Sequence, residues 1–248
     1  MGKNEAGKVS RLLARARESG VIPWHWIVDE TREIEQAAQW SDGEVFIEQV
    51  VRQYRRNCWL DQPCRVEVIS EKGTVRGVLA PVLDHFGAAF RVMHGFGSAT
   101  ALNDMARAIN ESAVPSILFY VGDYDPSGLY MSEADLPERL ARYGADPDAY
   151  DLRRVALIRE DVGGLPYFPA DTKRGDARHE WFVRRYGSRC WELDAMNPND
   201  LRERVRACIT DCLDLGAWKH ALNIQAAERE SKDSFMADWQ RMLRGGRA

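Results

Sequence analysis

The sequence lacks any long apolar run: none of its hydrophobic stretches approaches the roughly 20 residues that a membrane-spanning helix needs. Residues 1–8 are mostly polar and do not form the apolar core of a secretory signal. These two absences argue against an integral membrane protein. We therefore expect a cytoplasmic location and no membrane partner.

Motifs that would supply zinc or nucleotide chemistry are also absent. The five cysteines include no CxxC pair and the five histidines are scattered singly, so neither a disulfide framework nor a zinc site is expected. Cys208 and Cys212 lie four residues apart in a helical pattern, which predicts a core role for both. The phosphate-cradling sequence GxxxxGK(S/T) does not occur, so nothing in the chain would power an ATP-driven gate.

The composition is that of an ordinary globular protein, with 45% apolar residues in 248, enough for one large domain or two small ones. The net charge of -4 is unevenly distributed. Residues 3–17 and 173–189 are basic, whereas residues 123–151 carry eight acidic residues against two arginines. Such an arrangement would suit a polyanion held by the basic segments and a metal ion held by part of the acidic one. Charge runs alone favour the alternative, solvated helix faces.

The first 62 residues read as part of a winged-helix module. Apolar spacing predicts a helix over residues 6–19, and a short β-prone aromatic segment follows at 21–28. A second helix is expected at 43–57, and the break at residues 61–63 is our predicted domain boundary. Three basic residues of the first helix share a face that could lie along a phosphate backbone: Lys8, Arg11 and Arg15.

Residues 63–196 alternate between strand and helix patterns, which predicts an α/β domain with a mostly parallel, Rossmann-like sheet flanked by helices. The apolar run 116–121 is typical of a strand buried on both faces. Residues 197–248 are predicted to form a C-terminal helical extension. The expected strands cover residues 65–70, 89–93, 116–121, 154–158 and 190–193.

Carboxylates follow two of these strands. Glu71 comes directly after the first, and Asp123 and Asp125 come after the most apolar one. Ligands of parallel sheets bind beyond the carboxyl ends of the strands, and neighbouring carboxylates there repel unless a cation lies between them. Oxygen ligands of this kind suit Mg²⁺. The alternative is a polar turn in which Asp125 caps the next helix, with Glu71 as an ordinary surface residue.

Two motifs resemble the Toprim family: Val-Glu-Val-Ile-Ser-Glu-Lys at 66–72 and Ile-Leu-Phe-Tyr-Val-Gly-Asp-Tyr-Asp-Pro-Ser-Gly at 117–128. The second is similar to the DxDPSG form of the A subunit of topoisomerase VI. The resemblance implies a Toprim fold, with Glu71 as the Toprim glutamate and Asp123 and Asp125 as metal-binding aspartates. It also implies Mg²⁺, with Mn²⁺ as an alternative ion, and phosphodiester chemistry on DNA.

The chain departs from that family at the nucleophile. Topoisomerase VI-like proteins attack DNA with a tyrosine of an upstream winged-helix domain, whereas no tyrosine here precedes Tyr54, which lies among arginines. We therefore expect hydrolysis or nicking without a covalent tyrosine intermediate. Glu71 could bind metal or transfer a proton, and Lys72 is expected to pair with the phosphate.

A Gly- and Pro-rich connection spans residues 161–178 and ends in basic residues. A connection of that length is typical of a binding loop. We expect three of its residues to hold a phosphate backbone near the metal: Lys173, Arg174 and Arg178. Glu192 and Asp194 could bring a further carboxylate to the same edge, or simply occupy an exposed strand end.

Other functions and partners stay open at this point. A non-catalytic DNA-binding or assembly subunit is the competing class, and a Toprim-type maturase acting on RNA is a third. The tryptophans at residues 24–26 and the C-terminal helix leave room for a homodimer. The missing ATP-binding motif leaves room for a separate ATPase subunit.

Overall fold

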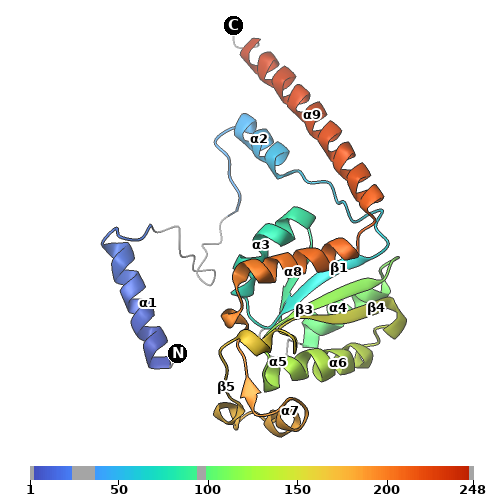
Figure 1. Cartoon of the computed structure of the whole chain (residues 1–248). Coiled ribbons are helices and arrows are strands. Elements are labelled where there is room, and N and C mark those ends of the chain that lie inside the picture. The colour runs from blue at the N-terminus through green and yellow to red at the C-terminus, as the bar shows by residue number, and fades with distance from the viewer. Residues whose placement is uncertain (1–2, 24–36, 94–98, 246–248) are drawn as a thin grey trace. The chain divides into compact units, whose positions relative to one another are not determined.

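The computed structural model in Figure 1 describes residues 3–23, 37–93 and 99–245. It divides into two compact units, Met1–Val50 and Val51–Ala248. The first unit contains α1 (Lys3–Glu18) and most of α2 (Gly43–Gln53). Both helices were predicted, although α2 ends four residues earlier than expected. The predicted strand at 21–28 lies largely outside the described residues, so the winged-helix reading stays a prediction.

A four-stranded parallel sheet organises the second unit, in the strand order β2-β1-β3-β4. The α/β class with a parallel sheet is thereby confirmed. Helices connect successive strands, as parallel pairing requires. The strands are β1 (Arg65–Ser70), β2 (Ala89–Val92), β3 (Ser116–Val121) and β4 (Tyr150–Ala156), and the helices between them are α3 (Val75–Phe86), α4 (Ala99–Asn110), α5 (Pro126–Tyr130) and α6 (Leu136–Arg142).

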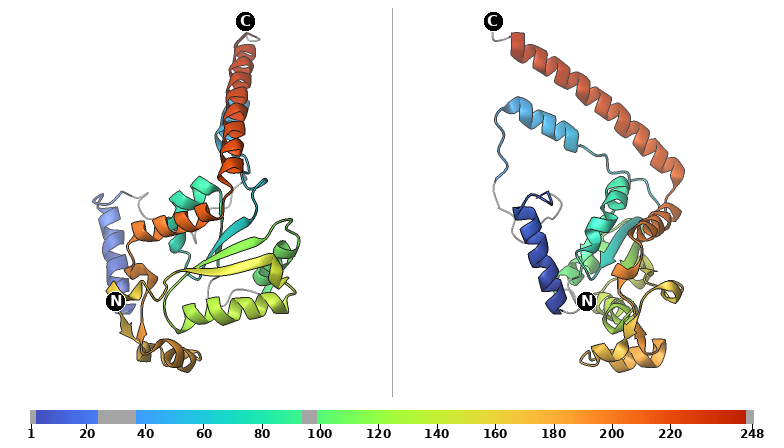
Figure 2. Two further views of the ribbon diagram at one scale, coloured as in Figure 1. Left: turned by 45° about the vertical axis from the view of Figure 1, so that its right-hand side comes forward. Right: turned by 60° about the vertical axis from the view of Figure 1, so that its left-hand side comes forward.

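Helices lie on both faces of the sheet (Figures 1 and 2), and the central strand β3 contributes side chains to a core on each face. Ile117, Phe119 and Val121 belong to the core that includes α3 and α8 (Pro198–Asp211). Leu118 and Tyr120 belong to the core that includes α4 and α6. Side chains of a strand alternate between its faces, so only a continuous apolar run can fill both cores.

Two strands differ in position or pairing from those predicted from the sequence. The last strand of the sheet begins at Tyr150 and not at Arg154, because Asp151 and Arg153 are the exposed positions of an alternating, half-buried edge strand. The strand expected at 190–193 does not join the parallel sheet. Residues Arg189–Cys190 form β6, which pairs antiparallel with β5 (Phe168–Pro169) in a separate two-stranded sheet.

The remaining elements are short helical segments, one of them an α-helix, and the two C-terminal helices that were predicted. Trp218 and Ala221, near the start of α9 (Leu215–Gly245), are buried in the larger core. Cys208 and Cys212 pack against that core, as expected. In the described part of the chain, none of the helices combines the length and apolarity of a bilayer crossing. The short elements are η2 (Met131–Asp135), η3 (Pro147–Ala149), η4 (Val162–Gly164), η5 (Ala170–Lys173), α7 (His179–Tyr186) and η6 (Leu193–Ala195).

Candidate functional site

The predicted carboxylates lie at one edge of the sheet. Ser70 of β1 pairs in register with Val121 of β3, so the residues that follow these strands emerge side by side. The side chains of Asp123 and Asp125 are only 8% and 2% exposed, and Glu71 is half-buried. Two aspartates so deeply buried need partners, because an unpaired buried charge is costly.

The turn after β3 has little freedom. Asp125 is the N-cap of α5: its Oδ1 accepts a hydrogen bond from Gly128 N at 2.7 Å, and Pro126 occupies the first turn. A Cβ on Gly128 would lie 2.3 Å from the carbonyl oxygen of Asp123, so only glycine fits there. The helix-cap reading of Asp125 is therefore correct, and it uses one of the two carboxylate oxygens.

Arg154 of β4 binds the same turn from the neighbouring strand. Its Nη1 donates to Gly128 O at 2.9 Å and to the Ser132 hydroxyl at 2.7 Å, and its Nε donates to Leu157 O at 2.7 Å. Its Nη2 donates to the carbonyl oxygens of Gly122, at 3.1 Å, and Asp123. The Arg154 guanidinium thus binds the backbone of the turn that carries Asp123 and Asp125, and it also binds the residue that follows β4. Burial lowers the pKa of Arg154.

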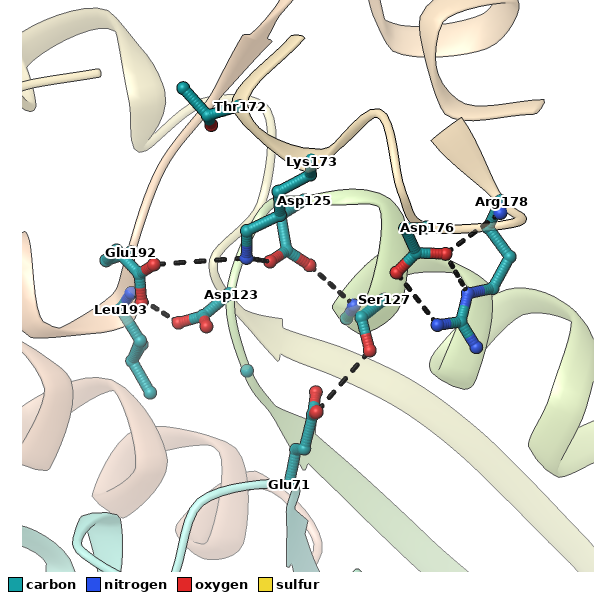
Figure 3. A network of polar contacts seen from close by, with 12 residues as sticks. Glu71, Asp123, Asp125, Ser127, Thr172, Lys173, Asp176, Arg178, Glu192 and Leu193 are labelled. Carbon is teal, nitrogen blue, oxygen red and sulfur yellow. Dashed lines mark hydrogen bonds and ion pairs between the residues drawn. The ribbon is translucent and has the colours of Figure 1, made fainter. Parts of the chain in front are cut away.

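Two lysines neutralise the aspartates. Lys72 Nζ lies 2.9 Å from Asp123 Oδ2 and 2.6 Å from Glu192 Oε2. Lys173, at the end of η5, forms an ion pair with Asp125 and lies 3.9 Å from Glu192 Oε1. Figure 3 shows Glu192 and Asp125 on either side of the Lys173 ammonium. We call these five residues the lysine–carboxylate network.

Glu71 lies beside this network and does not contact its lysines directly. Its closest polar contact is with the Ser127 hydroxyl, at 3.4 Å (Figure 3). Burial, and next the charge of Asp125, raise the pKa of Glu71. Within the described residues, no group of three or more His, Cys, Asp or Glu side chains has the geometry of a metal site. Carboxylate oxygens are the ligands that hard cations prefer, but both aspartates are paired with lysines in this structure.

Burial and ion pairing shift the pKa values of the network in opposite directions, and the larger effect differs from residue to residue. Burial raises the pKa of Asp123 to about 6, and the Leu193 amide and Lys72 only partly offset this effect. Burial alone would also raise the pKa of Glu192, but hydrogen bonding to Lys72 leaves it lowered. Burial disfavours the charged form of Lys72, yet Glu192 and Asp123 outweigh it and raise that pKa. Desolvation thus dominates at Asp123, whereas pairing dominates at Lys72.

Comparisons with models of known families, curated proteins and solved structures find no match. The function must therefore be argued from the site.

Of the basic residues predicted to contact a phosphate, Lys72 and Lys173 form ion pairs with the two aspartates. Arg174 is exposed and pairs with Asp171 at 2.9 Å. Arg178 pairs with Asp176, with Nη2 to Oδ2 at 2.8 Å (Figure 3). The three basic residues of the first helix that were predicted to lie along a phosphate backbone are exposed on α1: Lys8, Arg11 and Arg15.

Sequence reasoning missed Arg154 and left Glu192 undecided. Arg154 had a usable signal, because residues 150, 152 and 154 are the inward positions of an alternating strand. An arginine at such a position must find acceptors. Glu192 had no such signal, since its place depends on the antiparallel bridge between Tyr124 and Trp191.

We predict that Arg154→Lys lowers the free energy of unfolding by about 3 kcal/mol, because an ammonium cannot reach all five acceptors and leaves buried carbonyls unpaired. Urea denaturation measures the effect. The matched control is Arg153→Lys at the adjacent exposed position, which should change stability by less than about 0.5 kcal/mol. Equal effects of the two substitutions would contradict the assigned role of Arg154.

The raised pKa of Asp123 predicts a pH-dependent stability. Without metal, the folded chain keeps a proton on Asp123 up to about pH 6, whereas the unfolded chain releases it near its ordinary value of 3.8. The folded state therefore binds more protons between these values, and this contribution to stability is lost as pH rises through about 6. Wild type should lose about 2 kcal/mol more than Asp123→Asn between pH 4 and 7. Parallel stability curves for the two proteins would refute the assignment.

Proposed function

We propose that this chain is a Mg²⁺-dependent phosphodiesterase of the Toprim type that nicks or hydrolyses DNA. The observation that carries the proposal is the pair Asp123 and Asp125, almost fully buried and held rigidly at the carboxyl edge of a parallel sheet, with their outer oxygens facing cationic groups. The motifs at 66–72 and 117–128 support the same reading, because their carboxylates follow adjacent strands.

Each residue of the site has a chemical task in this proposal. Asp123 and Asp125 would hold the ion, and Glu71 would complete its ligands or accept a proton from the attacking water. Mg²⁺, or Mn²⁺ in its place, supplies charge to the phosphate and lowers the pKa of bound water. Lys72 and Lys173 would neutralise the non-bridging phosphate oxygens, since both ammoniums already lie at this edge.

The surroundings of Tyr54 support hydrolysis over a covalent tyrosine intermediate. Its hydroxyl donates a hydrogen bond to Glu228 of α9 at 2.5 Å, and Arg56 binds the same carboxylate at 2.9 Å. This tyrosine is thus engaged with the C-terminal helix. Water is accordingly the proposed nucleophile.

A specific observation also favours the competing function, a non-catalytic DNA-binding or assembly subunit. Lysines already compensate the charges of both aspartates, and a site neutralised in this way can be purely structural. DNA is the proposed partner in both cases. A homodimer is supported by exposed apolar side chains on α9, among them Phe235 and Met242. An ATPase subunit and an RNA substrate stay expectations from the sequence.

A plasmid assay separates the two functions. Purified wild type with Mg²⁺ or Mn²⁺ should convert supercoiled DNA to the nicked form, and Asp123→Asn/Asp125→Asn should reduce the rate at least about 100-fold, because the ion loses both charged ligands. Glu71→Gln should also reduce it at least about 10-fold. Asp148→Asn, at an exposed acidic position, is the matched control and should leave the rate unchanged.

The outcomes differ between the hypotheses. Metal-dependent nicking that the double substitution abolishes supports the phosphodiesterase. Nicking that survives it comes from a contaminant. A wild type that binds DNA but never nicks it contradicts the proposal and favours the assembly subunit.

A further inference from the structure

Every oxygen of the two aspartates has a partner in the structure. Asp123 Oδ1 accepts from Leu193 N at 2.8 Å and from Lys72 at 3.0 Å, and its Oδ2 faces Lys72. Asp125 Oδ1 accepts from Gly128 N, and its Oδ2 pairs with Lys173. A metal ion bound to these carboxylates must therefore replace some of these contacts.

The hydrogen-bond partners of the two aspartates differ in how easily a metal ion could displace them. The amides of Leu193 and Gly128 belong to the main chain, so giving them up would disrupt η6 and the start of α5. The lysines are flexible side chains with 30% exposed surface, and rotation about side-chain bonds suffices to move their ammoniums. The lysine ammoniums are the contacts that a cation would displace.

A displaced ammonium needs another anion. Glu192 already pairs with Lys72, whose ammonium lies 2.6 Å from Oε2, whereas the Lys173 ammonium lies 3.9 Å from Oε1. Glu192 therefore cannot fully replace Asp125 as the anion that pairs with Lys173. Lys72 also lies 3.7 Å from Asp194 Oδ2, so it has two further carboxylates besides Asp123, whereas Lys173 has only the more distant Glu192 among the residues of the network. A backbone phosphate of DNA is an anion that can receive the Lys173 ammonium.

We propose that Lys173 couples metal binding to DNA binding. Without DNA, its ammonium competes with the metal ion for Asp125; when a backbone phosphate is present, Lys173 transfers to it and leaves Asp125 to the ion. Metal and DNA then bind with positive cooperativity, and by linkage each raises the affinity for the other equally. The inference rests on the proposed function, and it makes Lys173 a residue that binds the phosphate directly.

The experiment measures Mn²⁺ affinity of the full chain by electron paramagnetic resonance of the free ion, with and without a saturating short DNA duplex. For wild type, DNA should tighten Mn²⁺ binding at least about 5-fold. Lys173→Met keeps the bulk of the side chain without its charge. It should bind Mn²⁺ at least about 3-fold tighter than wild type without DNA, and DNA should then change its affinity less than about 2-fold.

Arg142→Met is the matched control: it removes an exposed charge on α6, where the guanidinium pairs with Glu138 at 2.6 Å, and should behave as wild type. If Lys173→Met binds Mn²⁺ no tighter than wild type, or keeps the full DNA effect, the coupling role is refuted. If wild type and Lys173→Met bind no more Mn²⁺ than Asp123→Asn/Asp125→Asn, the proposed metal site itself fails. Thermal unfolding of each variant verifies that it is folded.

Discussion

The arrangement of the site depends on one buried guanidinium. Arg154 crosses from β4 to the turn after β3 and binds carbonyl oxygens of Gly122, Asp123, Gly128 and Leu157. The carbonyls of Gly122 and Gly128 also accept hydrogen bonds from Leu157 N and the Ser132 hydroxyl, so the guanidinium matters most for the carbonyls of Asp123 and Leu157, where the chain leaves the sheet. By joining them, Arg154 fixes the backbone that carries both aspartates. The carboxylates can then remain buried and close together without unfolding the turn.

The cost of burying those carboxylates is met by charges from distant parts of the chain. Lys72 follows β1, whereas Lys173 arrives on η5 after the long connection from β4. The antiparallel bridge between Tyr124 and Trp191 brings Glu192 to the same place. The small β5–β6 sheet thus has a functional consequence: it closes a loop that delivers one lysine and one glutamate to the edge of the main sheet.

The main strands and helices could be predicted from the sequence because each has its signal within a short stretch of the chain. The apolar run of β3 and the helical periodicity of α3 are unambiguous, and carboxylates after parallel strands must meet at one edge. The β5–β6 pairing could not be predicted, since two-residue strands carry no periodicity. Arg174 and Arg178 were grouped with Lys173 from composition alone, and their role in DNA binding stays a prediction; in the structure they pair with Asp171 and Asp176. Composition indicates a basic loop but not which of its charges are already paired.

The central claim is that Asp123 and Asp125 form a divalent-metal site. Anomalous diffraction from a crystal grown with Mn²⁺ tests it most directly. The account predicts a strong peak within about 2.0–2.6 Å of a carboxylate oxygen of each aspartate, with the Lys173 ammonium moved away from Asp125. A map with Lys173 still on Asp125 and no peak between the two aspartates would contradict it.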